Sequence, residues 1–326
     1  MKLAIKQSGF NTTLLGVLRG VADFLEIDAS DSTLYGATGH AFLLNINKII
    51  EAGGPYFWNR SHFSRLAKNL GIEMTGYGVF SAETAPADRQ RMESLIKESL
   101  DSGIPCSMIY LENQLVTGYD ETGFDTAGPW ELNKEFPPRR LTFGSWQELG
   151  PDFGMGFYTF KKIAPADKGT MVRESLEYAV DLLKNPQAHA HADAIANGPM
   201  SYGIGPTGYD NWLVAIDEYG SSHGNWWNAT VYAECRHHAG KYLAEIGQWF
   251  PAIAVPANAL SQAYADIADG LFRASAKEMP VAEKKALVAE LKAQELATES
   301  RKMGLSVKRG WFLAADRCFS GVRSAR

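Results

Sequence analysis

The sequence has little cysteine. Cys106, Cys235 and Cys318 are the only three among 326 residues, and they lie far apart, with no CxxC pair. A low, odd number of this kind argues against a disulfide framework or a zinc knuckle, and it is typical of a reducing compartment. We therefore expect a cytoplasmic protein whose cysteines play no structural bridging role.

Long apolar runs and an excess of positive charge are also missing. No stretch reaches the about 18 apolar residues that a membrane span requires, and Lys6, Asn11 and Arg19 interrupt the N-terminal apolar residues. The formal net charge is -5, and the basic residues are scattered. Because nucleic-acid binding needs a basic stripe, we expect neither a nucleic-acid nor a membrane partner.

The chain does contain an ordinary globular balance, with 45% hydrophobic residues and a length that suggests about two domains. In the first half, helical spacing is followed by short runs rich in strand-forming residues. The expected helices are 11–26, 33–52, 61–70 and 86–102, and the expected strands or loops are 104–111, 115–119, 141–149 and 155–163. This order predicts an α+β domain over residues 1–164.

The second half is predicted to be all helical. Beyond a linker at 165–169, apolar residues recur at helical spacing in several long segments. One such seam consists of Trp227, Val231, Cys235, His238, Tyr242, Ile246 and Trp249. The pattern predicts a helical bundle over residues 170–326. Its tryptophans, Trp212, Trp226, Trp227 and Trp249, suggest a surface that would support a homodimer.

Two motifs suggest cofactors but lack the necessary context. Residues 203–208 spell GxGxxG, yet no strand is expected before them and no acidic partner follows at the spacing of a dinucleotide site. His189 and His191, with Asp193 nearby, lack further ligands at a recognisable spacing. We expect no cofactor and no metal.

The sequence alone does not decide the roles of two individual residues, His40 and Glu112. His40 follows Gly39 among apolar neighbours, so it is either a structural histidine or a ligand contact. Glu112 stands at the edge of the expected strand pair, where its carboxylate either points into a cleft or is solvated.

Residues 112–120, Glu-Asn-Gln-Leu-Val-Thr-Gly-Tyr-Asp, resemble the histidine-bearing strand of papain-like proteins related to the bacteriocin-processing peptidases. The first helix, residues 36–42 and residues 105–110 follow in matching order, so the resemblance covers about residues 8–160. It extends to bacterial proteins that join such a domain to a helical one, and to the N-terminal domain of the butirosin-biosynthesis acyltransferase. The resemblance implies a papain-like (cysteine proteinase-like) domain followed by an all-α domain.

The family mechanism, as the resemblance implies it, uses a cysteine at the start of a long helix and a histidine on a facing strand. Here the helix start reads Phe-Asn-Thr-Thr-Leu over residues 10–14, with no cysteine. The histidine position, six residues before Gly118, holds Glu112, or Asn113 if the register shifts by one. The third, orienting position corresponds to Asp125. Loss of both main partners predicts a protein without cysteine-peptidase activity, a pseudoenzyme.

Three hypotheses follow. The leading one is a binding protein that holds a small polar, amine-bearing or peptide ligand in a cleft between the first helix and the strand of Glu112. Its expected ligand contacts are Asn11, Thr13, His40, Tyr119, Asp120 and Trp130. The second is an amidohydrolase or acyltransferase that uses Glu112 with a hydroxyl or water, with Thr12 and Asp125 as the other catalytic residues. The third is a homo-oligomeric scaffold formed through the helical domain.

Overall fold

The computed structural model describes residues 1–130, 136–191 and 201–307. It divides the chain into two compact units, one made of Met1–Ser30 with Leu70–Pro165 and the other of Asp31–Asn69 with Ala166–Arg326. The division after Pro165 lies within the expected linker. Residues 31–69 differ from the expectation, because they belong to the second unit and not to the first.

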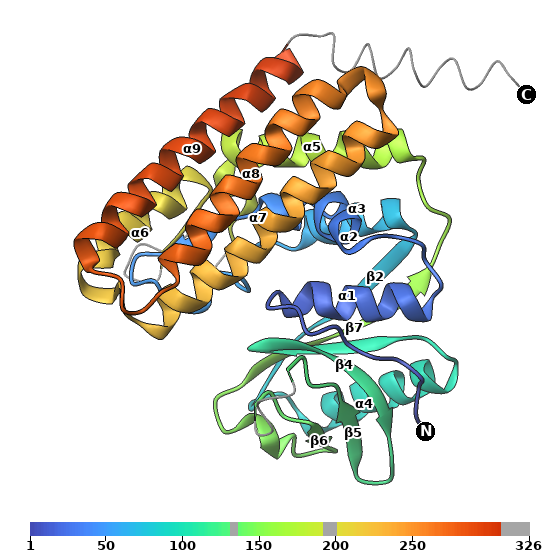
Figure 1. Ribbon diagram of the computed structural model, residues 1–326. Coiled ribbons are helices and arrows are strands. Elements are labelled where there is room, and N and C mark those ends of the chain that lie inside the picture. The colour runs from blue at the N-terminus through green and yellow to red at the C-terminus, as the bar shows by residue number, and fades with distance from the viewer. Residues whose placement is uncertain (131–135, 192–200, 308–326) are drawn as a thin grey trace, which may run out of the picture. The chain divides into compact units, whose positions relative to one another are not determined.

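The first unit is built on a six-stranded antiparallel sheet with the strand order β2-β7-β3-β4-β5-β6 (Figure 1). Its strands are β2 (Ile72–Ser81), β3 (Cys106–Tyr110), β4 (Glu112–Tyr119), β5 (Gly123–Thr126), β6 (Arg140–Thr142) and β7 (Gly154–Lys162). Each of the segments expected as strands or loops from residue 104 onward contains or overlaps a strand, although β6 covers only the start of 141–149. Strand β2 was not predicted, because Gly76 and Gly78 weaken its alternating pattern.

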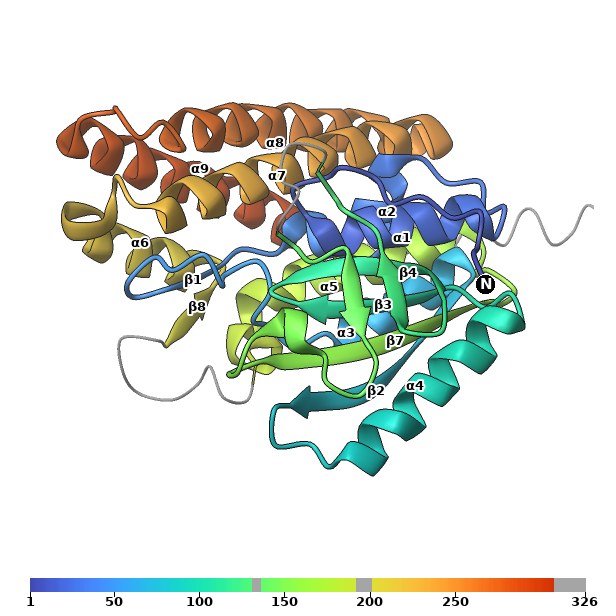
Figure 2. The same cartoon turned by 90° about the horizontal axis from the view of Figure 1, so that it is seen from below.

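Two helices cover the sheet, α1 (Thr13–Phe24) and α4 (Pro86–Asp101), and both confirm the predicted helices. Leu115 of β4 lies against Gly20 of α1, whereas Cys106, whose cross-strand partner is Val116, lies near Ser99 of α4. Neighbouring residues of a strand point to opposite faces, so the two helices cover opposite faces of the sheet. Figure 2 shows the strands between them.

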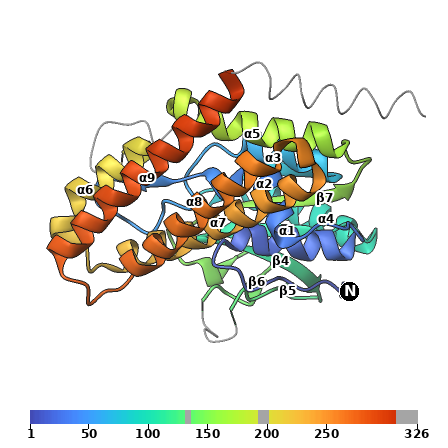
Figure 3. The same ribbon diagram turned by 45° about the horizontal axis from the view of Figure 1, so that its top comes forward.

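The second unit is mainly helical (Figure 3). Its α-helices are α2 (Asp31–Ala37), α3 (Ser61–Ala67), α5 (Lys168–Lys184), α6 (Pro206–Tyr219), α7 (His223–Trp249), α8 (Ala254–Ala274) and α9 (Val281–Val307). Two short strands, β1 (Asn45–Asn47) and β8 (Tyr202–Ile204), pair antiparallel. The short 3-10 helices of this unit are His40–Phe42, Pro186–His189 and, between α7 and α8, Pro251–Ile253. Gln147–Leu149 lies in the first unit, and Lys68–Leu70 spans the boundary between the two units in the sequence.

Helix α7 is the centre of the second unit, and most of its predicted seam is buried, including Val231, Cys235 and Ile246. The fully buried Arg236 forms an ion pair of 2.6 Å with Glu295 of α9. The same guanidinium donates to the carbonyl oxygens of Ala41 and Leu43. These contacts explain why residues 31–69 belong to the helical unit.

The prediction of one helix over 33–52 is wrong after residue 37. Helix α2 ends at Ala37, and Gly39 adopts a left-handed conformation with φ of 76°. The chain then forms the 3-10 helix His40–Phe42 and strand β1. Helical periodicity is outweighed here by packing on α7, where the ring of Tyr242 lies against Gly36.

The tryptophan surface expected for a homodimer is also wrong in part. Trp212 is fully buried and donates its indole N–H to Asn225, and Trp227 is 7% exposed and donates to the hydroxyl of Tyr56. Both serve the core of their own unit, so only Trp226 and Trp249 keep partial exposure.

None of the helices in residues 1–130, 136–191 and 201–307 has the length and apolar character needed to cross a bilayer.

Candidate functional site

Glu112 is placed by a very tight connection between β3 and β4. Tyr110 and Glu112 are cross-strand partners, so Leu111 alone turns the chain. Leu111 has φ of 54° and is 61% exposed. A leucine in the left-handed region is strained, and such a conformation persists where the surrounding structure over-determines it. The next residue, Glu112, is 6% exposed.

The hydroxyl of Thr13 meets Glu112 at the start of α1. Thr13 is fully buried, and its Oγ1 donates to Oε2 of Glu112 at 2.7 Å. The same oxygen accepts from the backbone N–H of Asn113 at 3.1 Å and from its Nδ2 at 3.3 Å. A hydroxyl has one donor and two acceptor positions, so all three are used. We name Thr13, Glu112, Asn113 and Gln7 the Thr13 cluster.

Gln7 completes this cluster. Its side-chain amide donates to the carbonyl of Asn113 at 2.8 Å and accepts from the N–H of Leu115 at 2.8 Å. Strand β5 pairs with β4 only from Val116 onward, so the Gln7 amide pairs with the part of β4 that β5 does not reach. Buried peptide groups must find such partners, and a side chain supplies them here.

Sequence reasoning missed Gln7, although a signal for it exists in α1. Gly16 and Gly20 lie one turn apart in the helix, where glycine is unfavourable unless another chain segment comes close. The carbonyls of Ser8 and Lys6 would lie 2.5 Å and 2.3 Å from a Cβ at these two positions. The pair of glycines thus lets the segment around Gln7 pass between α1 and β4.

The electrostatic setting of Glu112 is that of a helix N-terminus. Helix α1 has no acidic residue in its own first turn. The partial positive charge of a helix start favours a carboxylate nearby, and Glu112 of β4 supplies one through Thr13. The arrangement can therefore hold a buried negative charge.

Thr12, expected as the catalytic hydroxyl, occupies the N-cap of α1. Its carbonyl accepts from Leu15 and Gly16, and its side chain makes no capping hydrogen bond. The residue that meets Glu112 is Thr13, one position later. The role of Thr12 as a catalytic hydroxyl stays a prediction.

Asp125 and Asp120 lie at the other end of β4. Asp125 is the cross-strand partner of Gly118 and forms an ion pair of 2.8 Å with Arg140. Asp120 accepts from Arg140 and from Thr122. We name these four residues, Asp120, Thr122, Asp125 and Arg140, the Arg140 cluster. The hydrogen bond from Arg140, followed by those from Thr122, holds the pKa of Asp120 well below its usual range.

Tyr119 belongs to the same end of the strand. A strand rises about 3.3 Å per residue, so Tyr119 lies roughly 20 Å from Glu112 along β4. Its hydroxyl donates to the carboxylate of Asp101 at 2.8 Å, and this hydrogen bond raises the pKa of Tyr119. Tyr119, Asp120 and Asp125 therefore do not join Glu112 in one site, contrary to the expectation.

Asn11 and Trp130 lie outside regular elements. Asn11 is half-buried just before the N-cap of α1. Trp130 is half-buried in the segment after β5, and its carbonyl accepts from Arg139 at 2.9 Å. The carbonyl of Pro129 lies 3.0 Å from the Cβ position of Gly9, so this segment passes the residues that lead into α1.

His40 belongs to the second unit, whereas the Thr13 cluster belongs to the first. It is 2% exposed, with its ring centroid 5.2 Å from that of Trp58, and neither ring nitrogen has a hydrogen-bond partner among the described residues. Desolvation, with smaller contributions from Arg60 and Arg236, lowers its pKa to about 3. His40 is thus a neutral, buried imidazole.

The remaining candidates for thiol or metal chemistry are buried or scattered. Cys106 and Cys235 are both buried, and desolvation raises the pKa of Cys106 to about 12. Within the ranges that the structure describes, no three His, Cys, Asp or Glu side chains are arranged to hold a metal ion. Asp193 and Cys318 lie outside these ranges.

Comparison of the chain with protein-family models, curated proteins and solved structures found no match.

Proposed function

We propose that the first unit is a papain-like domain without cysteine chemistry, and that it binds a small polar, amine-bearing ligand through the carboxylate of Glu112. The observation that carries this proposal is the hydrogen bond of 2.7 Å between Thr13 and Glu112. It brings the start of α1 against the start of β4, which is where the resemblance puts the thiol and the imidazole.

The hydrogen bonds of Thr13 favour binding over catalysis. A nucleophilic hydroxyl must reach its substrate, but Thr13 is fully buried. Its donor position is used by Glu112 and both acceptor positions by Asn113. The hydroxyl–carboxylate pair has the distance of a nucleophile and its base, yet Thr13 is held as a structural group.

Glu112 differs from Thr13 because it keeps 6% exposure beside the exposed Leu111. A carboxylate that is almost desolvated attracts a cation more strongly than a solvated one does, because the local dielectric constant is low. An ammonium group also donates several charge-assisted hydrogen bonds to one carboxylate. A primary amine therefore fits this position better than an anion or an apolar group.

Binding is tested by calorimetric titration with spermidine and with glucosamine. Glu112→Gln keeps an acceptor for Thr13 while it removes the charge, so we expect at least about a tenfold loss of affinity with nearly unchanged thermal stability. Asp125→Asn is the matched control, since it removes an exposed carboxylate of the same sheet, and it should leave affinity unchanged. Equal affinity of the wild type and Glu112→Gln would contradict the proposal.

The papain-like placement has its own test in the double variant Thr13→Cys with Glu112→His. A thiol at a helix start beside an imidazole has a lowered pKa. Because position 13 is fully buried, the thiol is titrated through the ultraviolet absorbance of its thiolate, and we expect a thiol pKa below that of free cysteine. The single variant Thr13→Cys, which lacks the imidazole, serves as control, and equal thiol pKa values in the two variants would refute the placement.

A further inference from the structure

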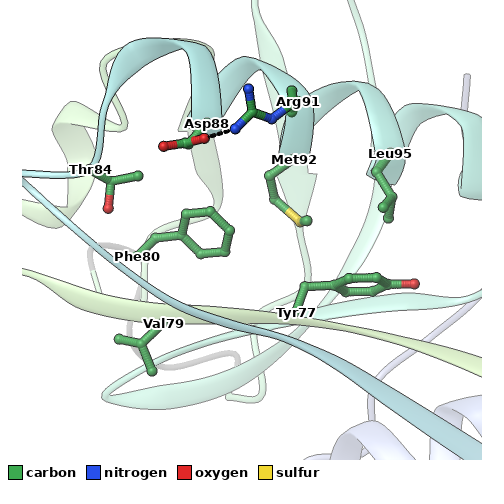
Figure 4. A pocket seen from close by; sticks show the side chains of 8 residues that line it. All are labelled: Tyr77, Val79, Phe80, Thr84, Asp88, Arg91, Met92 and Leu95. Carbon is green, nitrogen blue, oxygen red and sulfur yellow. Dashed lines mark hydrogen bonds and ion pairs between the residues drawn. The ribbon is translucent and has the colours of Figure 1, made fainter.

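A groove with a volume of about 490 Å³ lies in the first unit between β2 and α4, away from the Thr13 cluster (Figure 4). Apolar side chains from both elements line it, namely Tyr77 and Phe80 from β2 and Met92 and Leu95 from α4. Small-molecule sites have volumes of about 300 to 1,000 Å³ and are mainly apolar with a few polar groups. The groove therefore has the size and lining of a ligand site.

Two opposite charges lie side by side on its rim. Asp88, in the first turn of α4, and Arg91, one turn later, form an ion pair, and their side chains are 45% and 74% exposed. Figure 4 shows this pair above the ring of Phe80 and beside Met92. Exposed ion pairs of this spacing are weak, so a ligand that supplies both opposite charges can replace the pair.

The walls of the groove are held in place. Arg89 donates to the carbonyls of Ala82 and Thr84, which fixes the turn that joins β2 to α4. The hydroxyl of Tyr77 hydrogen-bonds Thr159 of β7 at 3.0 Å, which fixes the Tyr77 ring at the sheet edge. A rigid site loses less entropy on binding than a mobile one.

We propose that this groove binds a free α-amino acid with an apolar side chain. An α-amino acid carries an ammonium and a carboxylate on one carbon, and these complement Asp88 and Arg91, which also lie next to each other. Its side chain enters the apolar part of the groove between Phe80, Met92 and Leu95. Charge complementarity and apolar lining together select this class of ligand over a purely apolar molecule or an anion.

The first experiment is calorimetric titration of the full chain with L-phenylalanine, L-phenylalaninamide and N-acetyl-L-phenylalanine. The amide lacks the carboxylate and the acetyl compound lacks the ammonium. We expect both derivatives to bind at least about tenfold more weakly than the amino acid, because each loses one charge-assisted contact. Equal affinity for all three, or no binding of L-phenylalanine, would overturn the proposal.

Two charge variants assign the contacts. Asp88→Asn should weaken the amino acid about tenfold and leave the acetyl compound unchanged, whereas Arg91→Gln should weaken the amino acid and leave the amide unchanged. Glu98→Gln, an exposed change on α4 outside the groove lining, is the matched control and should change no affinity. Equal effects of the two variants on all three compounds would contradict the assignment.

A third variant tests the groove itself. Leu95→Trp fills the apolar part from a half-buried position and should abolish binding, while circular dichroism and the melting temperature report whether the fold is kept. Retained binding in a folded Leu95→Trp variant would overturn the proposed location. The same titrations are repeated in Glu112→Gln, which removes the amine contact proposed for Glu112. The three compounds should keep the same order of affinity there, so this inference and the proposed function fail separately.

Discussion

The two ends of β4 carry the same types of residue in different surroundings. At its start, the Thr13 cluster buries one carboxylate, with Glu112 6% exposed and hydrogen-bonded by the hydroxyl of Thr13. Beyond its end, the Arg140 cluster leaves two carboxylates in solvent, with the Asp120 and Asp125 side chains 59% and 47% exposed. Acidic residue type alone therefore says little about the role of a carboxylate in this sheet.

The difference teaches where a polar contact affects stability. A buried carboxylate that loses its hydrogen-bond donor cannot be resolvated, so its desolvation cost appears in full. An exposed carboxylate that loses its ion-pair partner returns to water at little cost. We expect substitutions that remove a hydrogen-bonding atom from the Thr13 cluster to act mainly on folding, and those in the Arg140 cluster to act mainly on local charge.

Thr13→Val is the strongest test of this comparison. It removes the donor to Glu112 and the acceptor for Asn113 while it preserves side-chain volume, so the free energy of unfolding should fall by about 3 kcal/mol. Urea denaturation at neutral pH measures the change. Thr13→Ser retains the hydroxyl and should lose only about 1 kcal/mol; equal losses in the two variants would show that the methyl group matters and the hydroxyl does not.

The imidazole of His40 is a further buried polar group, and neither of its ring nitrogens has a hydrogen-bond partner among the described residues. It can be compared with the buried carboxylate of Glu112. Its pKa is about 3 in the folded state against 6.5 when exposed, so below pH 6.5 the unfolded chain binds the proton first. The contribution of neutral His40 to the free energy of unfolding is fully present above pH 6.5 and is lost as the pH falls toward 3. Between pH 6.5 and pH 5 the loss should be about 2 kcal/mol.

The measurement compares urea denaturation of wild type and His40→Phe at pH 6.5 and pH 5. Phenylalanine can keep the aromatic contact with Trp58 but has no proton to take up, so its stability should fall less over this interval. His223→Gln, an exposed change in the same unit, is the control and should follow the wild type. A His40→Phe variant with the wild-type slope would contradict the assignment.

The sequence predicted helix α1 and its place beside the strand of Glu112, but not which hydroxyl contacts Glu112. The spacing of Leu14, Leu18 and Val21 predicted α1, and the resemblance predicted that its start faces the strand of Glu112, as the hydrogen bond from Thr13 confirms. Helix α1 begins at Thr13, two residues after the expected start at residue 11, and the hydroxyl of this first helical residue makes the contact. The papain-like fold itself stays a prediction.

The other errors come from contacts between residues that are distant in sequence. Asp120 is expected as a ligand contact and Asp125 as a catalytic residue, but the sequence does not reveal that both pair with Arg140, 15 residues or more away. His40 is grouped with Glu112 in the expected site because residues 36–42 fall within the resemblance, yet its segment packs on α7 and belongs to the other unit. Local patterns carry no information about such partners.

Gly20→Ala tests the close packing of the segment around Gln7 against α1, with a smaller expected effect on stability. Alanine normally stabilises a helix interior relative to glycine by about 1 kcal/mol. Here its Cβ would lie 2.3 Å from the carbonyl oxygen of Lys6 and 2.7 Å from Leu115, so we expect a net loss of about 1.5 kcal/mol. Thermal and urea denaturation measure it. Gly154→Ala, with open space around its Cβ position, should change stability little.

Asp125→Asn should have the smallest effect. Its ion pair with Arg140 is about half exposed, so the free energy of unfolding should change by less than about 0.5 kcal/mol. The same urea denaturation, repeated at high ionic strength, should make even this difference vanish, because salt screens exposed charges. A loss as large as that of Thr13→Val would remove the distinction between the two ends of β4.

The amide of Gln7 has a consequence for how the chain behaves in concentrated solution. An unpaired stretch of strand is a template on which a second molecule can add its own strand, the first step of aggregation. Gln7 occupies the carbonyl of Asn113 and the N–H of Leu115, and Ala127 donates to the carbonyl of Leu115, so this stretch of β4 is paired inside its own molecule. Its pairing therefore depends in part on one glutamine that lies outside every strand.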